Sequence, residues 1–196
     1  MSYPATLAQW NTRDHANTIE LFPAQPFLVF QLAKDLDIPS ILPSAMYCCS
    51  CTPDIKSLLD GILSVDGSHV DLEWEDKRTC LLARQQLYDA QRVRLFEGLL
   101  VHRGCGAPEC DSGRLEYIRR LELKTIQAGC PCGFQIGFDT HLFGGAVCPE
   151  CHDVGFESFL SARQGLWDDL PGLFGLPEWA QLVGGGPGGG VVEHRT

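Results

Sequence analysis

The fold is decided by residues 72–101, whose sequence is LEWEDKRTCLLARQQLYDAQRVRLFEGLLV. Asp71 precedes this stretch as a helix cap, and acidic residues fill the first turn, where the helix dipole is positive. Apolar residues recur at helical spacing along one face. These residues are Leu81, Tyr88, Leu95 and Leu99. The pattern predicts one long helix over residues 72–101.

Proline and glycine divide the sequence before this helix into shorter helices. Residues 26–50, PFLVFQLAKDLDIPSILPSAMYCCS, predict two helices that are broken at Ile38, because a residue before proline is pushed out of the α region. Residues 52–63, TPDIKSLLDGIL, predict a third helix. Thr52 is expected to be its N-cap, and Gly61 is expected to mark its end.

Two further amphipathic stretches follow the long helix. Residues 112–129 predict a helix, and so do residues 154–170. The apolar positions of the first stretch are Leu115, Ile118, Leu121 and Ile126. Between these helices the sequence is rich in glycine, and residues 134–138 predict a short strand.

The chain is therefore expected to be mainly α, with irregular, cysteine-rich loops and at most a short β element. We predict an N-terminal segment over residues 1–25, a helical module over 26–182 and a flexible glycine-rich tail over 183–196. Phe174 and Trp179 are expected to anchor the end of the module by packing on it.

Charge and composition restrict the functional class. The chain of 196 residues has a formal net charge of -10, which repels a phosphate backbone unless basic residues gather on one face. Ten basic residues do lie within residues 77–124, against six acids. On helices such charges more often form a solvated face. A nucleic-acid-binding module that uses residues 77–124 is kept as the alternative function.

The first 15 residues have no basic leader followed by an apolar run, so we expect no secretory signal, and no window approaches the roughly 18 apolar residues that span a bilayer. The sequence predicts an intracellular protein, cytoplasmic or nuclear, without a membrane partner. A reducing compartment disfavours structural disulfides. The ten cysteines are therefore interpreted as thiols or metal ligands.

Four cysteines lie within apolar helical sequence. They are Cys48, Cys49, Cys51 and Cys80. A thiol in such a position is most often a small core residue, so these four are left out of any predicted site.

The remaining cysteines form pairs in loops that contain glycine and proline. Cys148 and Cys151 have the two-residue gap of a zinc knuckle, and Cys105 and Cys110 enclose a wider turn. We predict that these four thiolates bind one structural zinc ion. The ion would join the loop after the long helix to the start of the last long helix.

Other interpretations of these cysteines stay open. The thiols could be reduced and without a metal, or Cys148 and Cys151 could be a redox pair, although no thioredoxin-like βαβ pattern surrounds them. The identity of the fourth ligand is also open. Residues that could replace a predicted ligand are Cys130, Cys132, His141 and His152.

The sequence carries no pattern of a catalytic site. Glu150 lies inside the knuckle, but the His-x-Glu and Pro-Cys-x-x-Cys elements of zinc deaminases do not occur, nor does a nucleophile elbow or a phosphate-binding loop. We therefore predict a protein that is not an enzyme and has no small-molecule substrate.

Five stretches in register carry a resemblance to a known family. They are PATLAQWNTRD (4–14), LAKDLDIPSILPSAMYCC (32–49), DKRTCLLARQQL (76–87), the two cysteine loops and SARQGLWDDLPGLFGLPEW (161–179). In this order they resemble the region that follows the BTB/POZ domain in fungal BTB-domain proteins. The resemblance implies that Met1 stands almost at the point where the BTB domain, a module for dimerisation and partner recruitment, would have ended, so we expect that domain to be missing here. The resemblance implies a structural metal role for the four cysteines.

Together these observations predict a protein–protein interaction module, stabilised by structural zinc, whose partner the sequence does not name. We expect a hydrophobic face between Trp10 and Phe30 to be open to that partner.

Overall fold

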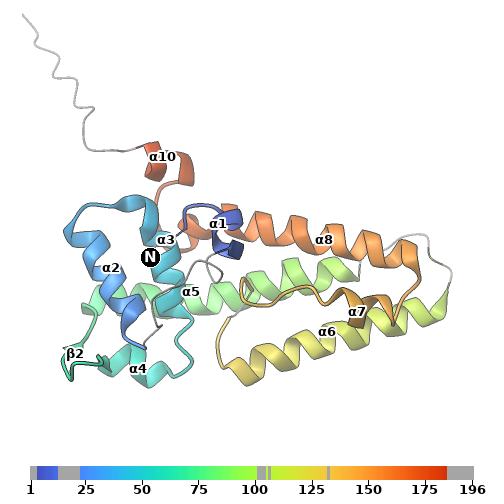
Figure 1. Ribbon diagram of the computed structural model, residues 1–196, viewed down its shortest axis with the longest axis horizontal. Coiled ribbons are helices and arrows are strands. Elements are labelled where there is room, and N and C mark those ends of the chain that lie inside the picture. The colour runs from blue at the N-terminus through green and yellow to red at the C-terminus, as the bar shows by residue number, and fades with distance from the viewer. Residues whose placement is uncertain (1–3, 13–22, 101–104, 106, 132, 185–196) are drawn as a thin grey trace, which may run out of the picture.

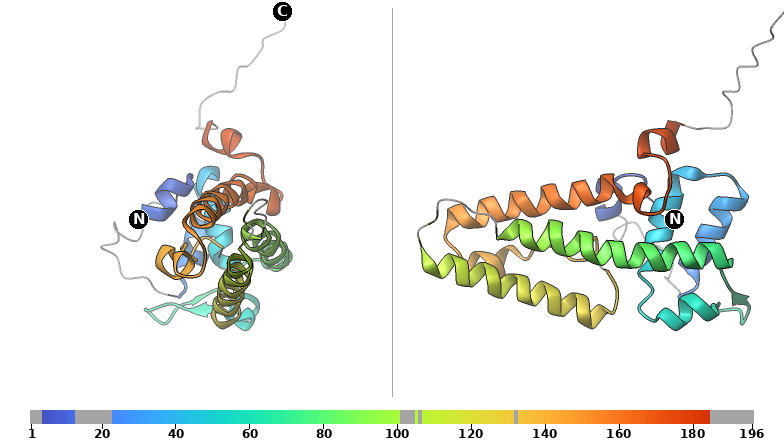
Figure 2. Two further views of the ribbon diagram at one scale, coloured as in Figure 1. Left: turned by 90° about the vertical axis from the view of Figure 1, so that its right-hand side faces the viewer. Right: turned by 180° about the vertical axis from the view of Figure 1, so that it is seen from behind.

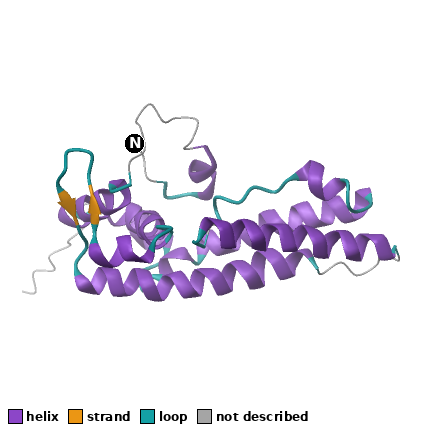
Figure 3. Cartoon of the chain, turned by 90° about the horizontal axis from the view of Figure 1, so that it is seen from below, coloured by secondary structure: helices purple, strands orange, loops and turns teal. Residues whose placement is uncertain are grey.

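The computed structural model describes residues 4–12, 23–100, 105, 107–131 and 133–184. Helices dominate it, and its single sheet has two short strands, so the predicted mainly α fold is confirmed (Figures 1 and 3). The short helices of the N-terminal half are α1 (Leu7–Thr12), α2 (Gln25–Asp35), η2 (Pro39–Ile41), α3 (Leu42–Ser50) and α4 (Ile55–Asp60). The strands are β1 (Ile62–Leu63) and β2 (His69–Val70). The remaining helices are α5 (Trp74–Ala90), η3 (Gln91–Phe96), η4 (Glu97–Leu99), α6 (Pro108–Ala128), α7 (Thr140–Gly144), α8 (Pro149–Asp168), α9 (Leu170–Leu173) and α10 (Trp179–Gly184).

Three long helices give the molecule its elongated shape. Helix α5 runs along the molecule toward one end, and α6 and α8 both begin at that end and run back (Figures 1 and 2). Helices α2, α3 and α4 gather at the opposite end. Helix α8 packs along η3 and η4, whereas α6 packs on α7. Cysteines at the starts of α6 and α8 are therefore placed at the same end of the molecule.

The long helix predicted over residues 72–101 is interrupted. Helix α5 begins after Glu73 rather than at an Asp71 cap, and it passes at Gln91 into the π turn η3 and then into η4. The Asp71 side chain instead accepts a hydrogen bond from the backbone N–H of Leu72 and forms an ion pair with Lys77. Residue 101 lies outside the described residues.

The buried face of α5 also differs from the predicted one, because it contains two cations. Leu81 and Tyr88 are only half-buried, while Lys77 and Arg84 are buried. Lys77 donates to the carbonyl of Leu59 near the end of α4. Arg84 donates to carbonyls at the ends of two helices, those of Ser50 and Thr52 after α3 and that of Gly129 after α6. Cations at these positions satisfy carbonyls that the helices leave without an internal partner.

One local prediction in the N-terminal half and one further along the chain are corrected. Asp54, not Thr52, caps α4 by accepting from the backbone N–H of Lys56, while the Thr52 hydroxyl donates to the carbonyl of Cys49 at the end of α3. The predicted end of α4 at Gly61 is confirmed, and its φ of 81° suits glycine. The strand predicted over residues 134–138 is wrong for the residues described there. The strands lie instead at β1 and β2, which pair antiparallel with Ile62 opposite Val70.

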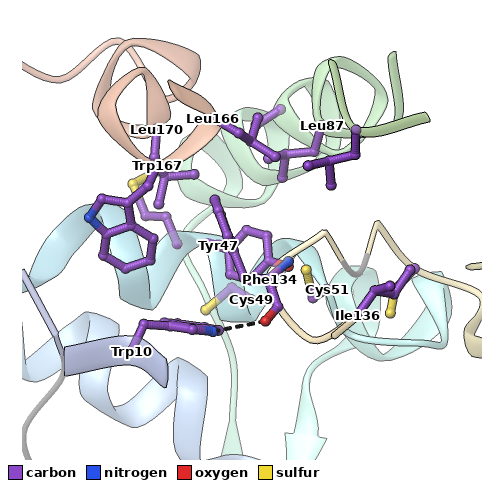
Figure 4. Close-up of a cluster of buried hydrophobic side chains, with 14 of the residues drawn as sticks. Trp10, Tyr47, Cys49, Cys51, Leu87, Phe134, Ile136, Leu166, Trp167 and Leu170 are labelled. Atoms are coloured by element: carbon purple, nitrogen blue, oxygen red, sulfur yellow. Dashed lines mark hydrogen bonds between the residues drawn. The ribbon is translucent and has the colours of Figure 1, made fainter. Parts of the chain in front are cut away.

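An aromatic cluster joins α1, α3 and the end of α8 to the loop that contains Phe134 (Figure 4). Trp10 of α1 lies against Tyr47 of α3 with ring centroids 5.3 Å apart, and Trp167 of α8 lies against Phe134 at 5.1 Å. The Trp10 indole and the Arg163 guanidinium both donate to the carbonyl of Phe134. The Phe134 N–H also donates to the Tyr47 hydroxyl, so side chains from three helices bond the backbone of Phe134 in place of a neighbouring strand.

Aromatic side chains near the end of the described chain also pack on this cluster or are buried. Trp179 of α10 stacks on Trp167 with an interplanar angle of 6°, and Phe174 is buried, as the sequence predicts. The expected open face between Trp10 and Phe30 is not formed by its two end residues, because both side chains and that of Phe27 are buried, whereas Leu28 is 37% exposed. The exposed fractions of Trp10, Phe30 and Phe27 are 4%, 2% and 0%. Residues 13–22 and 185–196 lie outside the described residues.

The cysteines predicted to be core residues are found there. Cys49, Cys51 and Cys80 are buried, and the half-buried Cys48 packs against the same core. Within the described residues, no helix is both long enough and apolar enough to cross a bilayer.

Candidate metal centre

The structure brings the four predicted ligands together at the end where α6 and α8 begin (Figure 1). Cys105 precedes α6 and Cys110 lies in its first turn, while Cys148 is the N-cap of α8 and Cys151 lies in its first turn. All four Sγ atoms lie within 4.8 Å of one another. The Sγ atoms of Cys105 and Cys148 are 3.9 Å apart.

Two prolines set these helix starts, and both starts come earlier than predicted. Helix α6 begins at Pro108 rather than at residue 112, and α8 begins at Pro149 rather than at residue 154. Proline suits the first helical position because its fixed φ is helical and its missing N–H is not needed there. Cys110 and Cys151 therefore lie on helices and not in flexible loops, which fixes the direction of their side chains.

A close backbone contact holds the two helix starts together. Gly113 of α6 faces the segment before Cys148, and a Cβ atom at Gly113 would lie 2.0 Å from the carbonyl oxygen of Ala146. Such a distance is far inside van der Waals contact, so only glycine allows this approach. Gly113 thereby allows the chain before Cys148 to reach the start of α6.

Hydrogen-bond donors surround the sulfur atoms. The backbone N–H of Cys148 donates to Sγ of Cys110 at 3.2 Å, and Nη1 of Arg114 lies 3.6 Å from Sγ of Cys151. The Arg114 side chain is 2% exposed and also forms an ion pair with Asp111 at 2.6 Å. The N-termini of α6 and α8 add the positive ends of two helix dipoles. These surroundings therefore favour thiolates in the cluster.

The thiols do not share one pKa. The backbone N–H and then the thiol of Cys151 donate to Cys148, which lowers the pKa of Cys148 to about 7. Burial and the neighbouring thiols raise the pKa of Cys151 well above its ordinary value. For Cys110 the N–H of Cys148 lowers the pKa, but burial and the thiols of Cys105 and Cys148 outweigh it and the net shift is upward.

The same negative groups act on Arg114. Burial lowers the pKa of this guanidinium, but the Asp111 carboxylate and the thiols of Cys151 and Cys110 raise it by more. Arg114 therefore stays charged beside the sulfur atoms.

This donor set fits a tetrahedral metal ion. A zinc ion with four Zn–S bonds of about 2.3 Å has S–S edges of roughly 3.8 Å, so small side-chain rotations would bring the four sulfurs onto one ion. Four thiolates and Zn²⁺ carry a net charge of about −2. Arg114 and the two helix N-termini offset part of that charge. The geometry is that of a four-cysteine group able to hold a metal.

The other residues considered as ligands lie elsewhere. Among the described residues, these four cysteines form the only group of three or more metal-binding side chains. Cys130 follows the far end of α6, about 27 Å of helix away from Cys110. His141 is exposed, and the His152 ring stacks on Phe156 while its Nδ1 atom contacts Asp153. Cys132 lies outside the described residues.

Sequence reasoning missed two residues of this site, Arg114 and Gly113. Arg114 follows Cys110 by one helical turn, so a helix that began at Pro108 would have placed the two side chains on one face. The predicted helix face was also partly wrong, since Leu115 and Ile126 are exposed at 57% and 71%. The buried face of α6 carries Cys110, Arg114, Tyr117, Ile118, Leu121 and Thr125.

Comparison with known proteins gives no match to a family model, to a curated protein or to a solved structure.

Proposed function

We propose that this protein is a non-enzymatic protein–protein interaction module whose thiol end is held by one structural zinc ion. The single observation that carries the metal is the convergence of the four Sγ atoms within 4.8 Å of one another. Zinc is favoured over other metals because a tetrahedral set of four thiolates is its usual structural site. The relationship to the region that follows fungal BTB/POZ domains stays a prediction.

A structural role is favoured over a catalytic one by the ligand count. A catalytic zinc keeps one position open for water or substrate, whereas four thiolates fill the tetrahedron. Glu150, the acid inside the knuckle, is exposed, and so is Glu109 beside Cys110. The ion would act on folding and not on a substrate.

The position of the cluster indicates what the ion would do. Helix α6 is attached at its far end by the Arg84 hydrogen bond to Gly129 and by the Gln91 hydrogen bond to Thr125. At the near end of α6, the thiol cluster joins α6 to the start of α8. The zinc ion would hold the near end, and the folding free energy of such a site is supplied by metal binding.

The nucleic-acid alternative is disfavoured by where the basic residues of 77–124 lie. Lys77, Arg84 and Arg114 are buried and bind carbonyls, carboxylates or sulfur inside the molecule. A second group pairs with acids, and its members are Arg78, Arg94, Arg119 and Arg120. Cations that are already paired release few counterions from a phosphate backbone. Residue 103 lies outside the described residues.

Exposed apolar side chains support a protein partner. Helix α2 carries a stripe of Leu28, Leu32 and Leu36 that is between 37% and 60% exposed. An open hollow of about 650 Å³ lies at α9 and α10, where Leu173, Leu176 and Trp179 are flanked by acids. The flanking acids are Asp168, Glu178 and Asp169, the last of which already pairs with Arg94. A partner segment with one apolar and one basic side chain would fit this hollow.

Metal content of the full chain, purified without added zinc, tests the proposal. We expect one zinc ion per chain, and we expect the Cys110→Ser variant to have lost it while Cys48→Ser keeps it. A chelator should reduce the helical circular-dichroism signal, and added zinc should restore it. A chain without stoichiometric metal that keeps its full helical signal would rule out the structural zinc ion.

A filter-binding titration separates the two functional classes. We expect weak binding of a duplex oligonucleotide at low salt and no steep dependence on salt. Tight binding whose logarithm falls steeply with salt concentration would favour the nucleic-acid alternative.

A further inference from the structure

The four thiols of the cluster fall into an accessible pair and a buried pair. Cys110 and Cys151 are 2% and 1% exposed. Cys105 and Cys148 are partly exposed. These two accessible sulfurs come from different segments, one before α6 and the other at the N-cap of α8. Their 3.9 Å separation is close to the contact distance of two sulfur atoms.

We propose that Cys105 and Cys148 are the site at which a peroxide oxidises the cluster, forming a disulfide between these two residues and expelling the zinc ion. The inference rests on the proposed zinc site and adds a modification to it. The geometry supports this pair because both sulfurs are reachable from solvent and are already near each other. An S–S bond of about 2.05 Å requires a further approach of roughly 2 Å, which side-chain rotation can supply.

The chemistry uses one peroxide molecule and two thiolates. One thiolate attacks a peroxide oxygen, the O–O bond breaks, hydroxide leaves and a sulfenic acid forms. The second thiolate attacks the sulfenic sulfur, the S–O bond breaks and a second hydroxide leaves. Two protons from solvent convert the hydroxides to water. The two sulfurs lose two electrons in total and the peroxide gains them.

Zinc leaves because two of its four ligands are consumed. The remaining thiolates, those of Cys110 and Cys151, would have to complete the coordination with water in a site whose sulfurs are buried. The new disulfide would still link the segment before α6 to α8. Oxidation would therefore exchange a metal clamp for a covalent one and leave Arg114 beside two thiols without an ion.

The main competing product is a disulfide between Cys148 and Cys151, which share one helix start. Burial of Cys151 behind Arg114 disfavours it, because the N–H of the guanidinium and the protein interior surround that sulfur. A disulfide between Cys105 and Cys110 is disfavoured for the same reason, since Cys110 is buried and accepts from the N–H of Cys148.

The test treats the zinc-loaded full chain with one equivalent of hydrogen peroxide. Zinc release is followed with a colorimetric zinc indicator, and disulfides are mapped by mass spectrometry after blocking of free thiols. We expect one zinc ion released per chain and a Cys105–Cys148 crosslink as the main product. Thiol reduction followed by added zinc should restore the metal content.

Two variants sharpen the result. In Cys105→Ser, mass spectrometry after peroxide treatment should find Cys148 as a free thiol or a sulfenic acid and not in a disulfide. Cys48→Ser removes a half-buried thiol outside the cluster and should behave as the unmodified chain does. Because the crosslink is mapped in the unmodified chain, the test holds even where Cys105→Ser lacks metal or folds poorly.

The outcomes separate this inference from the proposed function. A chain that carries no zinc before oxidation contradicts the proposed metal site, and the crosslink map still tests the pair. A zinc-loaded chain that forms mainly Cys148–Cys151 or Cys105–Cys110, or that keeps its zinc, contradicts the inference alone.

Discussion

Two buried arginines show how the ends of this molecule differ. Arg163, in the aromatic cluster, donates to the carbonyl of Phe134 and to Asn11, and burial lowers its pKa. Arg114, in the thiol cluster, contacts Cys151 and Asp111. Burial lowers the pKa of Arg114, but these two neighbours raise it by more, so the net shift is upward. The same side chain is thus destabilised as a cation at one site and stabilised at the other. The difference follows from the Asp111 carboxylate and the cluster sulfurs, which lie beside Arg114 and not beside Arg163.

This difference indicates two ways of holding helices together. At the aromatic cluster, rings from α1, α3 and α8 pack within 6 Å of one another and bury a large apolar area. At the thiol end, the helix starts meet through sulfur, a buried cation and a glycine contact. Sulfurs held this closely repel one another as thiolates unless a cation lies between them. We therefore expect the aromatic cluster to fold without metal and the thiol end to depend on it.

The largest effect is expected when the metal ligands are removed. The double variant Cys110→Ser/Cys151→Ser should bind no zinc, and structural zinc sites can supply folding free energy on the order of 10 kcal/mol. Amide hydrogen exchange should lose protection in the first turns of α6 and α8. Protection in α2 and α3 should persist.

The control for this prediction is Cys48→Ser/Cys49→Ser, which removes two thiols outside the cluster and should keep the zinc. Equal loss of protection in α3 and α8 after removal of the ligands would show that the two ends unfold as one unit. The thiol end would then not depend on the metal separately from the rest of the molecule.

A second large effect is expected at the aromatic cluster. Trp167 is 1% exposed and contacts Trp10, Phe134 and Trp179, so Trp167→Ala should lower the free energy of unfolding by about 3–5 kcal/mol. Urea denaturation measures this change, and the zinc content should stay at one ion per chain.

The matched control is Trp74→Ala, since Trp74 is 63% exposed at the start of α5. Its effect should stay within about 0.5 kcal/mol. Loss of zinc from Trp167→Ala under native conditions would contradict the independence of the two ends.

The sequence predicts the thiol end better than the aromatic cluster, and the reason is local. Cys148 and Cys151 are separated by two residues, so their shared turn is visible in the sequence. The convergence of that pair with Cys105 and Cys110 could be expected because zinc chemistry demands four ligands. The geometry of Gly113 against Ala146 could not, because a contact between distant backbone segments leaves no local pattern.

The aromatic cluster depends on tertiary contacts that override local preference. Residues 134–138 alternate like a strand, yet Phe134 offers its carbonyl to Trp10 and Arg163 rather than to a neighbouring strand. The buried face of α5 was misassigned for a related reason. Lys77 and Arg84 look like surface residues until the ends of other helices are placed against them.

A smaller effect is expected from the cation beside the sulfurs. Arg114→Met should weaken zinc binding by roughly 10–100-fold, because a residue that donates to a metal ligand stabilises its charged form. Competition with a chelator of known affinity measures this change. Arg119→Met, at a side chain that is 75% exposed on the same helix, should leave the affinity unchanged.

Arg163→Met provides the comparison between the two ends. It should destabilise the chain toward urea without changing the zinc affinity, since Arg163 contacts Asn11 and Phe134 and no sulfur. If Arg114→Met and Arg163→Met shift the zinc affinity equally, the charge argument for the thiol end fails.

The smallest effect concerns the backbone contact that brings the two helix starts together. Gly113→Ala gains about 1 kcal/mol of helix propensity but places a Cβ atom 2.0 Å from the Ala146 carbonyl, and forced contacts cost about 1–3 kcal/mol. We expect a net loss of about 1 kcal/mol, seen as a fall in Tm of roughly 2–4 °C. Gly172→Ala, in α9 with open space around the added atom, should leave Tm unchanged or slightly raised.

Gly113 sets the approach of Cys110 to Cys148. The fall in Tm caused by Gly113→Ala should therefore be larger in the zinc-bound protein than in the protein without zinc. A loss of the same size with and without the ion would show that the glycine serves helix packing alone and does not position the sulfurs.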